Sequence, residues 1–560
     1  TDGAGYYTVE RVPVGDFIVS SGDIDLGVYG EEQGSIASDG ETITLDIVMQ
    51  NNAITLPQYL YDGNIAQFYL QADGTIEPGQ NSVFSQYYSG TVKGGGVLEI
   101  VSDGTVYQFD GGEVPVQESM GREIIVRQND LAGLNITRKI YLPRDGYFAR
   151  YLEIVSNPTE LPITADIVAT SNLNYTVSDF HVITTTDGDD AIQIQGVDTP
   201  DTWVVIDDNN ANDPFVVTSY NRPPLAFVWA GEDAGLPPDT VEFVQRTGNT
   251  LPARVTAQWS QVTLNPGETR AFMHCIVQQV SREAAQASAE RLAALPPELM
   301  ASLSLTEMAM VQNFAMPADG SSALSPLPTL TGIVSGQVFA CDGITPAPSG
   351  YITDVMIKSD VIYYGRTYIA HPDTTGYFLY ESDLTGNPSY DVVLGIPLDG
   401  FTLSARVCRG SYCSYTSYPQ YYVVSPDVTG MLSNEQSVAV EDIIFSNTGI
   451  IEGTVRRATG TVVSGADVDI DMYPYSVEEE TGQDGSYFAA FLAPGTYALE
   501  VAAEGVPDQG YPIRAEATGA VVESLVSTVD ITLLFLGTVS GVVTGPDGSP
   551  MYNVRRSEER

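Results

Sequence analysis

The 560-residue sequence predicts an all-β protein that combines a large antiparallel β-sandwich, small sandwich repeats and one short helical linker pair. Two observations predict this class. Short runs of alternating apolar and polar residues recur between Gly, Asp and Asn turns over residues 51–280. A motif G-φ-φ-x-G-x-V, where φ is mainly apolar and x is any residue, begins at Gly332, Gly449 and Gly537.

Residues 1–50 match the C-terminal part of such a repeat. TDGAGYYTVERVPVGDFIV at the start of the chain aligns with GQDGSYFAAFLAPGTYALEV from Gly482, and TITLDIVMQ from Thr42 aligns with STVDITLLFLG from Ser527. The aligned pairs are Gly5 with Gly485, Tyr7 with Tyr487, Gly15 with Gly495, and Phe17 with Tyr497. We therefore expect repeats strung with almost no linker, and a chain that opens inside one repeat and ends inside another.

Residues 51–280 are expected to form the large β-sandwich. Their strand candidates are VLEIV, REIIVRQ, ARYLEIV, WVVID, AFVWA, RVTAQWSQVTL and RAFMHCIV. Runs of this length, separated by turn residues, are typical of antiparallel sandwiches.

Residues 281–331 are expected to form the helical pair and a linker. Ser281 can cap the helix SREAAQASAERLAAL, which Pro296 and Pro297 end. Ser304 and Glu307 have the spacing of a capping box that opens a second short helix. A Pro/Ser-rich stretch follows up to residue 331 and predicts a linker to the repeats.

The repeats occupy the rest of the chain. Repeat A spans 332–448, repeat B spans 449–536, and 537–560 is the N-terminal part of a further repeat. Repeat A carries a Tyr-rich insertion, RVCRGSYCSYTSYPQYYVV. Cys408 and Cys413 flank RGSY within it, a span that a hairpin can close with a disulfide, although a pair of reduced thiols fits the sequence as well.

A family resemblance rests on repeat B. GTVRRATGTVVSGADVDI followed by GQDGSYFAAFLAPGTYALEV resembles the carboxypeptidase regulatory-like (transthyretin-like) repeat of bacterial surface proteins. The resemblance covers residues 1–50 and 332–560, and it implies small transthyretin/Ig-like sandwiches without enzymatic activity. Residues 134–173 resemble more weakly the large sandwich domains attached to such repeats in secreted bacterial proteins.

Charge and composition restrict the partners. The formal net charge is −48, and the chain has only three lysines, Lys93, Lys139 and Lys358. An anionic surface of this kind repels nucleic acid phosphates, so we expect no nucleic acid partner. No apolar stretch reaches the length of a membrane span, and four cysteines suit an extracellular or cell-surface protein.

Catalysis is not expected. The three histidines, His181, His274 and His371, lie outside HExxH and other metal-ligand spacings, and G-x-S-x-G, P-loop and CxxC motifs are absent. A convergent pair of carboxylates stays open as an alternative, because sequence spacing says nothing about the distance between two acids in a fold.

Calcium is the cofactor that this composition favours, because it binds six to eight oxygens from carboxylates and carbonyls. Three acidic clusters qualify, and solvated surface acids are the alternative for each of them. The clusters are Asp187, Asp189 and Asp190; Asp207, Asp208, Asn210 and Asp213; and Asp467, Asp469, Asp471 and Glu478.

Tyrosine clusters indicate a possible glycan partner. The chain has 32 tyrosines, and Tyr415 and Tyr418 lie in the insertion of repeat A. Exposed Tyr rings stack on sugar faces, although strand propensity explains the same enrichment.

These observations favour an extracellular structural protein, a subunit or segment of a surface fibre or adhesin stalk, over the alternative of a carbohydrate-binding surface protein. We expect the terminal half-repeats to complete each other between copies by β-strand addition. The expected anchors are Val539, Val542 and Val543 on one copy and Val9, Val12, Phe17 and Val19 on the next. The alternative is a longer covalent array in which neighbouring repeats supply the same strands in cis.

Overall fold

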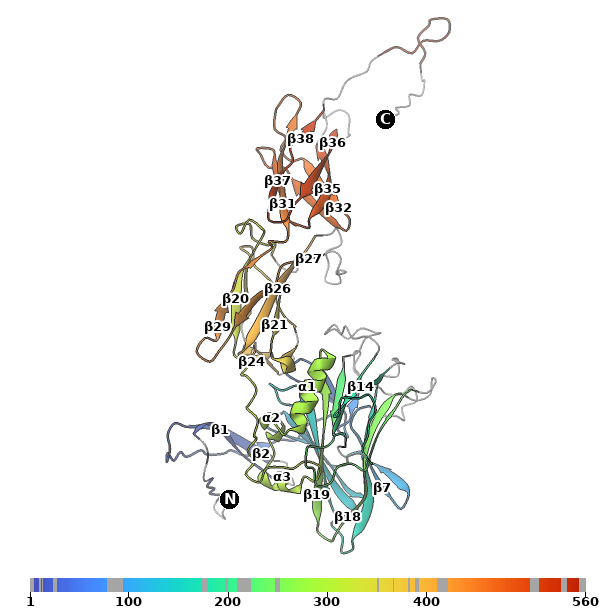
Figure 1. Cartoon of the computed structure of the whole chain (residues 1–560), viewed down its shortest axis with the longest axis vertical. Coiled ribbons are helices and arrows are strands. Elements are labelled where there is room, and N and C mark those ends of the chain that lie inside the picture. The colour runs from blue at the N-terminus through green and yellow to red at the C-terminus, as the bar shows by residue number, and fades with distance from the viewer. Residues whose placement is uncertain are drawn as a thin grey trace.

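The computed structural model is elongated, with a large sandwich at one end of its long axis and repeats A and B stacked beyond it (Figure 1). The structure describes residues 5–9, 12, 14–23, 28–77, 94–173, 180–196, 200–208, 223–246, 252–349, 352–365, 367–380, 383–387, 392–409, 422–503, 513–534 and 541–552. Within these ranges no helix is long and apolar enough to span a bilayer. The predicted all-β class is confirmed.

The large sandwich consists of two antiparallel sheets that enclose one apolar core. One sheet has the strand order β14-β15-β16-β19-β12-β11-β10-β9. Its strands are β9 (Val116–Glu118), β10 (Glu123–Leu131), β11 (Leu134–Tyr141), β12 (Phe148–Ser156), β14 (His181–Thr185), β15 (Trp203–Asp207), β16 (Leu225–Val228) and β19 (Thr269–Gln278). The other has the order β17-β18-β13-β7-β8, formed by β7 (Val97–Ser102), β8 (Thr105–Gln108), β13 (Ile163–Asn172), β17 (Thr240–Val244) and β18 (Arg254–Leu264). Each of the seven strand candidates of this region overlaps one of these strands, although REIIVRQ begins one residue before β10 and AFVWA extends two residues beyond β16.

Three helices in the described chain cover the outer face of the larger sheet. They are α1 (Arg282–Ala293), α2 (Pro297–Met300) and α3 (Leu305–Met310). The Ser281 side chain caps α1, and Ser304 with Glu307 forms the predicted capping box of α3. Leu292 and Ala289 of α1 pack with the sheet in a second apolar core. The helical pair is therefore part of the sandwich body as well as its connection to repeat A.

Repeats A and B share one topology. In repeat A, β20 (Ile333–Phe339) lies between β23 (Tyr377–Tyr380) and the parallel strands β29 (Val438–Val440) and β30 (Ile443–Ile444). In repeat B, β31 (Gly449–Arg457) lies between β34 (Ser486–Leu492) and the parallel strands β37 (Val526–Thr528) and β38 (Ile531–Leu533). In both repeats the G-φ-φ-x-G-x-V motif thus forms the central strand of its sheet.

The second sheets of the two repeats also correspond. Repeat A has β21 (Thr353–Ser359), β22 (Thr367–Ala370), β26 (Gly400–Cys408), β27 (Tyr422–Val424) and β28 (Val428–Met431). Repeat B has the order β33-β32-β35-β36, with β32 (Asp467–Met472), β33 (Tyr475–Glu480), β35 (Gly495–Ala503) and β36 (Ile513–Val521). A short hairpin of β24 (Asp383–Asn387) and β25 (Val392–Leu394) is added in repeat A.

Two small sheets precede β7, and the second of them contributes Leu60, Phe68, Leu70 and Ile76 to the apolar core of the large sandwich. β1 (Gly15–Asp23), β2 (Val28–Ile36) and β3 (Gln50–Asn51) form one, and β4 (Gln58–Tyr61), β5 (Gln67–Leu70) and β6 (Ile76–Glu77) form the other. Ala53 already bridges to Val116 at the edge of the large sheet, so the chain passes from one body to the next without a linker.

The joint between the large sandwich and repeat A is closed by tyrosines. The 3-10 helix η2 (Ile362–Tyr364) of repeat A places Tyr363 against Tyr147 of the sandwich, with ring centroids 5.1 Å apart. The Asn64 side chain donates to the Tyr363 carbonyl at 2.7 Å. Tyr364 is fully buried and donates its hydroxyl to the Asp145 carbonyl.

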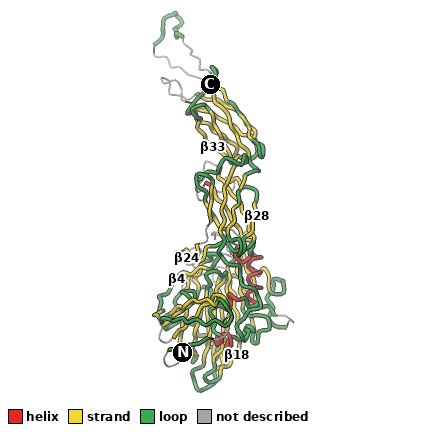
Figure 2. The backbone as a smooth tube through the Cα atoms, turned by 90° about the vertical axis from the view of Figure 1, so that its left-hand side faces the viewer, coloured by secondary structure: helices red, strands yellow, loops and turns green. Residues whose placement is uncertain are grey.

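The joint between repeats A and B has a shared core. Ile450 and Phe491 of repeat B belong to the apolar core of repeat A. The rings of Phe445 and Phe491 meet edge to face at 5.1 Å. Arg409 of repeat A donates to the Ala490 carbonyl of repeat B at 3.0 Å. The successive bodies are thus packed against each other, which the stacked arrangement in Figure 2 also shows.

Candidate functional site

Residues 5–50, which we call the half-repeat, fold like the second half of repeat B. β1 pairs with β2 in the register of β35 with β36, so that Phe17 faces Gly34 as Tyr497 faces Gly519. Gly5 has a φ of +86°, close to the +75° of Gly485 in the equivalent turn.

A tyrosine hydrogen bond fixes the next segment of the half-repeat. The Tyr7 hydroxyl donates to the Leu45 carbonyl at 2.7 Å, as the Tyr487 hydroxyl does to the Val529 carbonyl in repeat B. Leu45 also contacts Gly34, as Val529 contacts Gly519. Residues 43–48, which we call the acceptor edge, therefore lie over β1 and β2 as the equivalent segment of repeat B lies over β35 and β36.

In the complete repeats this segment crosses the central strand at the second glycine of the motif. A Cβ atom on Gly453 would clash with the Val529 carbonyl, and one on Gly336 would clash with that of Glu441. The amide after each glycine then donates to an aspartate. These bonds join Thr454 to Asp530 and Gln337 to Asp442, each at 2.9 Å. The second glycine of the motif thus leaves room for the crossing backbone, and the N–H of the next residue donates to the aspartate carboxylate.

The acceptor edge has no strand partner within the described residues. Asp46, the equivalent of Asp530, is exposed, and no hydrogen bond to its carboxylate is found among the described residues. Val9 is 58% exposed, whereas its equivalent Ala489 is fully buried. Val12, Phe17 and Val19 are half-buried, whereas their equivalents Leu492, Tyr497 and Leu499 are buried.

Residues 541–552 form the turn that opens a repeat. The Met551 amide donates to the Val543 carbonyl at 2.9 Å, as Val463 does to Val455 at 3.0 Å in repeat B. Gly541 has open space where Gly453 meets a backbone carbonyl. Val543 is 56% exposed and Val542 is 76% exposed, whereas Val455 is fully buried. Val539 lies outside the described residues.

In the first predicted calcium cluster, groups of the same turn donate hydrogen bonds to the carboxylates of Asp187 and Asp189. Thr185 donates its hydroxyl to Asp187 at 2.9 Å and to Asp189 at 3.2 Å. The Ala191 amide donates to Asp189 and lowers the pKa of that carboxyl. Asp190 is exposed.

The second cluster contains a buried ion pair. Asp207 accepts from the Arg282 guanidinium at 2.5 Å, and burial raises the pKa of Asp207 to about 6 despite that cation. Asp208 is buried and its carbonyl accepts from Arg282. Asn210 and Asp213 lie outside the described residues.

The third cluster is a row of acids across the outer face of a sheet. Asp469 on β32 is opposite Glu478 on β33 and Glu500 on β35, and Glu500 is opposite Glu516 on β36. Asp467 and Asp471 project from the same strand. In the part of the chain that the structure describes, no group of three or more His, Cys, Asp or Glu side chains is placed to hold a metal ion. Calcium binding therefore stays a prediction.

The insertion of repeat A is described only at its ends. Cys408 is disulfide-bonded, whereas Cys275 and Cys341 are free. Cys413, Tyr415 and Tyr418 lie outside the described residues.

Ionisable side chains meet inside the large sandwich. Arg138 and His274 both contact the Glu153 carboxylate, at 2.6 Å and 3.2 Å. Burial opposes ionisation of Glu153, but the charge of Arg138 prevails and lowers the pKa of this carboxyl. All three groups are buried between the sheets, so a substrate has no access to them.

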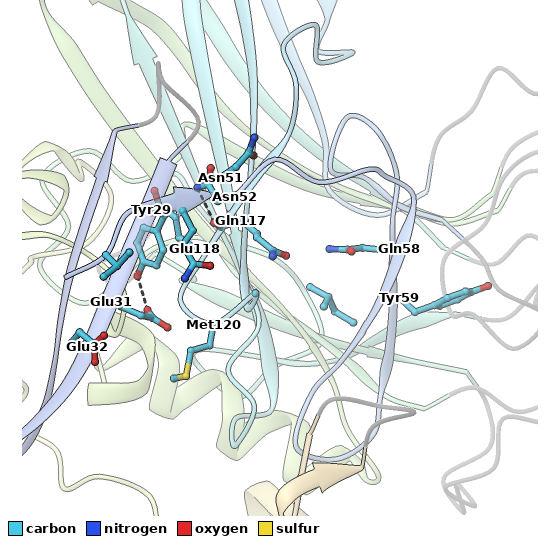
Figure 3. A pocket seen from close by; sticks show the side chains of 15 residues that line it. Tyr29, Glu31, Glu32, Asn51, Asn52, Gln58, Tyr59, Gln117, Glu118 and Met120 are labelled. Atoms are coloured by element: carbon cyan, nitrogen blue, oxygen red, sulfur yellow. Dashed lines mark hydrogen bonds between the residues drawn. The ribbon is translucent and has the colours of Figure 1, made fainter. Parts of the chain in front are cut away.

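A polar cavity of about 580 Å³ lies where the half-repeat meets the large sandwich (Figure 3). Its lining includes Glu31, Asn51, Gln58, Gln117 and Glu118. The Tyr29 hydroxyl donates to Glu31 at 2.7 Å. No motif in the sequence indicates this cavity, because its walls come from segments far apart in the chain.

Sequence reasoning also missed the joint residues. Tyr363 and Tyr364 are adjacent in the sequence, and paired tyrosines are a signal for stacking, but the partners Tyr147 and Asn64 are distant in sequence. Arg409 lies beside the predicted disulfide, and nothing in its neighbourhood indicated a contact with repeat B.

No protein-family profile matches the chain, and no curated protein matches it in sequence. A solved polysaccharide lyase is similar in structure, with 9% identity and a TM-score of 0.25 over 85% of this chain and 44% of the lyase. The shaft pilin SpaA from Lactobacillus rhamnosus GG has 11% identity and a TM-score of 0.21 over 38% of this chain and 100% of the pilin. A minor pilin from Streptococcus agalactiae has 12% identity and a TM-score of 0.15 over 38% of this chain and 99% of its own. At these TM-scores the similarities carry no argument about function. This chain spans less than half of the lyase.

Proposed function

We propose that the protein is a structural segment of an extracellular fibre or adhesin stalk and acts there as a rigid spacer. The observation that carries this proposal is the shared packing at the joints. Phe491 of repeat B is part of the core of repeat A, and Tyr363 of repeat A packs against the helical face of the large sandwich.

Rigidity follows from this packing. Domains joined by flexible linkers move freely unless the interface between them is large and apolar. Here, bending either joint would expose buried aromatic rings and break the Asn64 and Arg409 hydrogen bonds. The large sandwich, repeat A and repeat B are therefore expected to move together as one rigid unit. The proposal assigns no catalytic activity.

Small-angle X-ray scattering and negative-stain electron microscopy of the purified chain test this function. We expect one elongated shape with a narrow distribution of angles between the bodies. A matched variant with a Gly/Ser segment inserted after Thr448 should give a broad distribution. Equal breadth for both proteins would contradict the spacer function.

We further propose that copies assemble head to tail, by addition of the strand that ends at Val543 to the half-repeat of the next copy. The half-repeat supports this mode because its apolar residues are exposed where repeat B buries them. An unpaired strand edge is a template for such addition. Because the donor and acceptor surfaces differ, the contact propagates into a fibre instead of closing as a dimer.

Carbohydrate binding is the second candidate, and the polar cavity favours it. Carboxylates and amides line the cavity, and Tyr59 at its rim is 46% exposed and stacks on Tyr69. Such groups bind sugar hydroxyls and ring faces. A glycan array should show saturable binding that Gln117→Ala abolishes and that Tyr107→Ala, a remote exposed position, leaves intact. Absence of binding to any glycan would reject this candidate.

A further inference from the structure

We propose that Asp46 and the Leu45 carbonyl of one copy bind the backbone at Gly541 and Val542 of a second copy of this chain. We call this contact the lock. The inference rests on the head-to-tail assembly proposed above and names its register. Gly541 passes beneath the Leu45 carbonyl, and the Val542 amide donates to the Asp46 carboxylate. The Val543 side chain packs against the exposed apolar residues of the half-repeat.

The lock is already present twice within the molecule. In repeat B, Gly453 lies under the Val529 carbonyl and the Thr454 amide donates to Asp530 at 2.9 Å. In repeat A, Gly336 and the Gln337 amide make the same contacts with Glu441 and Asp442. The occupant of such an edge is in both cases a strand with the G-φ-φ-x-G-x-V motif.

The acceptor half is preassembled. The bond from Tyr7 to Leu45 and the contact of Leu45 with Gly34 reproduce those of Tyr487 and Val529 in repeat B. Asp46 is exposed at the position of Asp530. Repeat B differs from the half-repeat at this point because Ile451 and Val455 of its motif strand are present and fully buried.

The donor half carries the matching groups. The motif places Gly541, Val542 and Val543 at the positions of Gly453, Thr454 and Val455. A Cβ atom on Gly541 would lie in open space, so this glycine is free to pass under another backbone. Val542 corresponds to Thr454, whose side chain is half-exposed in repeat B. We therefore expect Val542 to bind through its amide, and Val543 to bind through its side chain.

The fold sets the direction and excludes pairing within one copy. β31 runs parallel to β38, with Val455 opposite Ile531, so Val543 is expected opposite Ile47. The segment 541–552 lies beyond repeat B at one end of the molecule, and β1 lies beside the large sandwich at the other (Figure 1). Segment 541–552 of the same copy is therefore not placed to fill this edge, and we propose a second copy as its occupant.

Point variants test the lock. Val542→Pro removes the amide donor and Asp46→Ala removes the acceptor, and each should weaken association at least about tenfold, because hydrogen bonds to charged groups are among the strong ones. Val542→Thr, which copies repeat B, and Asp39→Ala, an exposed acid of the same half-repeat, should assemble like the wild type. Sedimentation velocity over a concentration series gives the association constants.

Cross-linking tests the register. A mixture of Ile47→Cys and Val543→Cys proteins should form a disulfide-linked pair, since side chains on neighbouring strands lie within reach. Asp39→Cys mixed with Val543→Cys should not. Fibres that form equally well with Asp46→Ala and Val542→Pro would overturn the lock while leaving the assembly intact. A wild-type chain that stays monomeric at all concentrations would overturn both, and the scattering experiment on rigidity would still stand.

Discussion

At the residue scale, the motif glycines and Asp207 show how close contacts with distant parts of the chain determine which residue a position needs. In repeats A and B the second glycine of the motif, Gly336 or Gly453, has no room for a Cβ atom where another backbone crosses it. Asp207 is a carboxylate held out of water with one guanidinium partner. In both cases the identity of the residue follows from contacts with distant parts of the chain.

Gly453→Ala should destabilise repeat B by more than about 2 kcal/mol, because the added methyl group would meet a backbone carbonyl that is fixed by the sheet. Gly541→Ala is the matched control and should not change the melting temperature of the monomer, since that position is open. Thermal unfolding of the two variants at a low protein concentration decides this. A loss of stability of the same size in both would show that glycine acts through the unfolded chain alone.

Asp207 should lower the free energy of unfolding as the pH rises. Burial raises its pKa from 3.8 to about 6, so the folded state favours the protonated form more than the unfolded state does. Its contribution to the free energy of unfolding is therefore present below the unfolded pKa and is lost as the pH rises through about 6. Relative to the wild type, Asp207→Asn should gain stability between pH about 4 and about 6 and then stay level. Urea unfolding across this range, with Asp39→Asn as the control, would reject the argument if the trend were reversed.

At the scale of elements, the G-φ-φ-x-G-x-V strand organises each repeat. Its pairing with two short parallel strands leaves a crossover that the motif glycine accommodates. Its antiparallel neighbour in the sheet of repeat B, β34, ends in residues that contact the neighbouring repeat: Ala490 accepts from Arg409, and Phe491 enters the core of repeat A. One strand thus stabilises its own sheet and the joint.

Phe491→Ala should cost about 3–5 kcal/mol of unfolding free energy, as expected for removing a fully buried aromatic ring. It should also broaden the distribution of angles between repeats A and B in electron micrographs, since the contact with Phe445 is lost. Phe488→Ala on the same strand, where the ring is 39% exposed, is the control and should cost less than about 1 kcal/mol. A destabilised variant whose repeats stay aligned would show that the ring does not hold the joint.

At the scale of the whole molecule, charge is the dominant property. A net charge of −48 is carried on an elongated body, and acids face each other across the outer sheet of repeat B. Burial and then the neighbouring carboxylates, first Glu478, raise the pKa of Asp469. Self-association of such a body needs screening or cation binding.

Sodium chloride at about 0.5 M should therefore raise both the melting temperature and the extent of assembly. Asp469→Asn should reduce this salt effect in repeat B. If the acidic loops bind calcium, calcium chloride should raise the melting temperature further than sodium chloride at the same ionic strength. Equal shifts with the two salts would reject calcium binding and leave screening alone.

The sequence by itself determined the class, seven of the strands of the large sandwich and the correspondence of the half-repeat with repeat B. These follow from local rules: side chains alternate along a strand, and turns need glycine at positive φ, as at Gly5 and Gly485. It also placed the two capped helices, because a capping residue acts within its own first turn.

Only the tertiary structure decided what the motif glycine accommodates, which groups close the joints and how the acids pair. The bond from Thr454 to Asp530 spans 76 residues, the bond from Asn64 to Tyr363 spans 299, and the one from Arg282 to Asp207 spans 75. Residues this far apart meet because sheets and repeats pack, and no spacing in the sequence encodes that contact. The predicted calcium ligand Asp207 therefore turned out to face a cation of the protein itself.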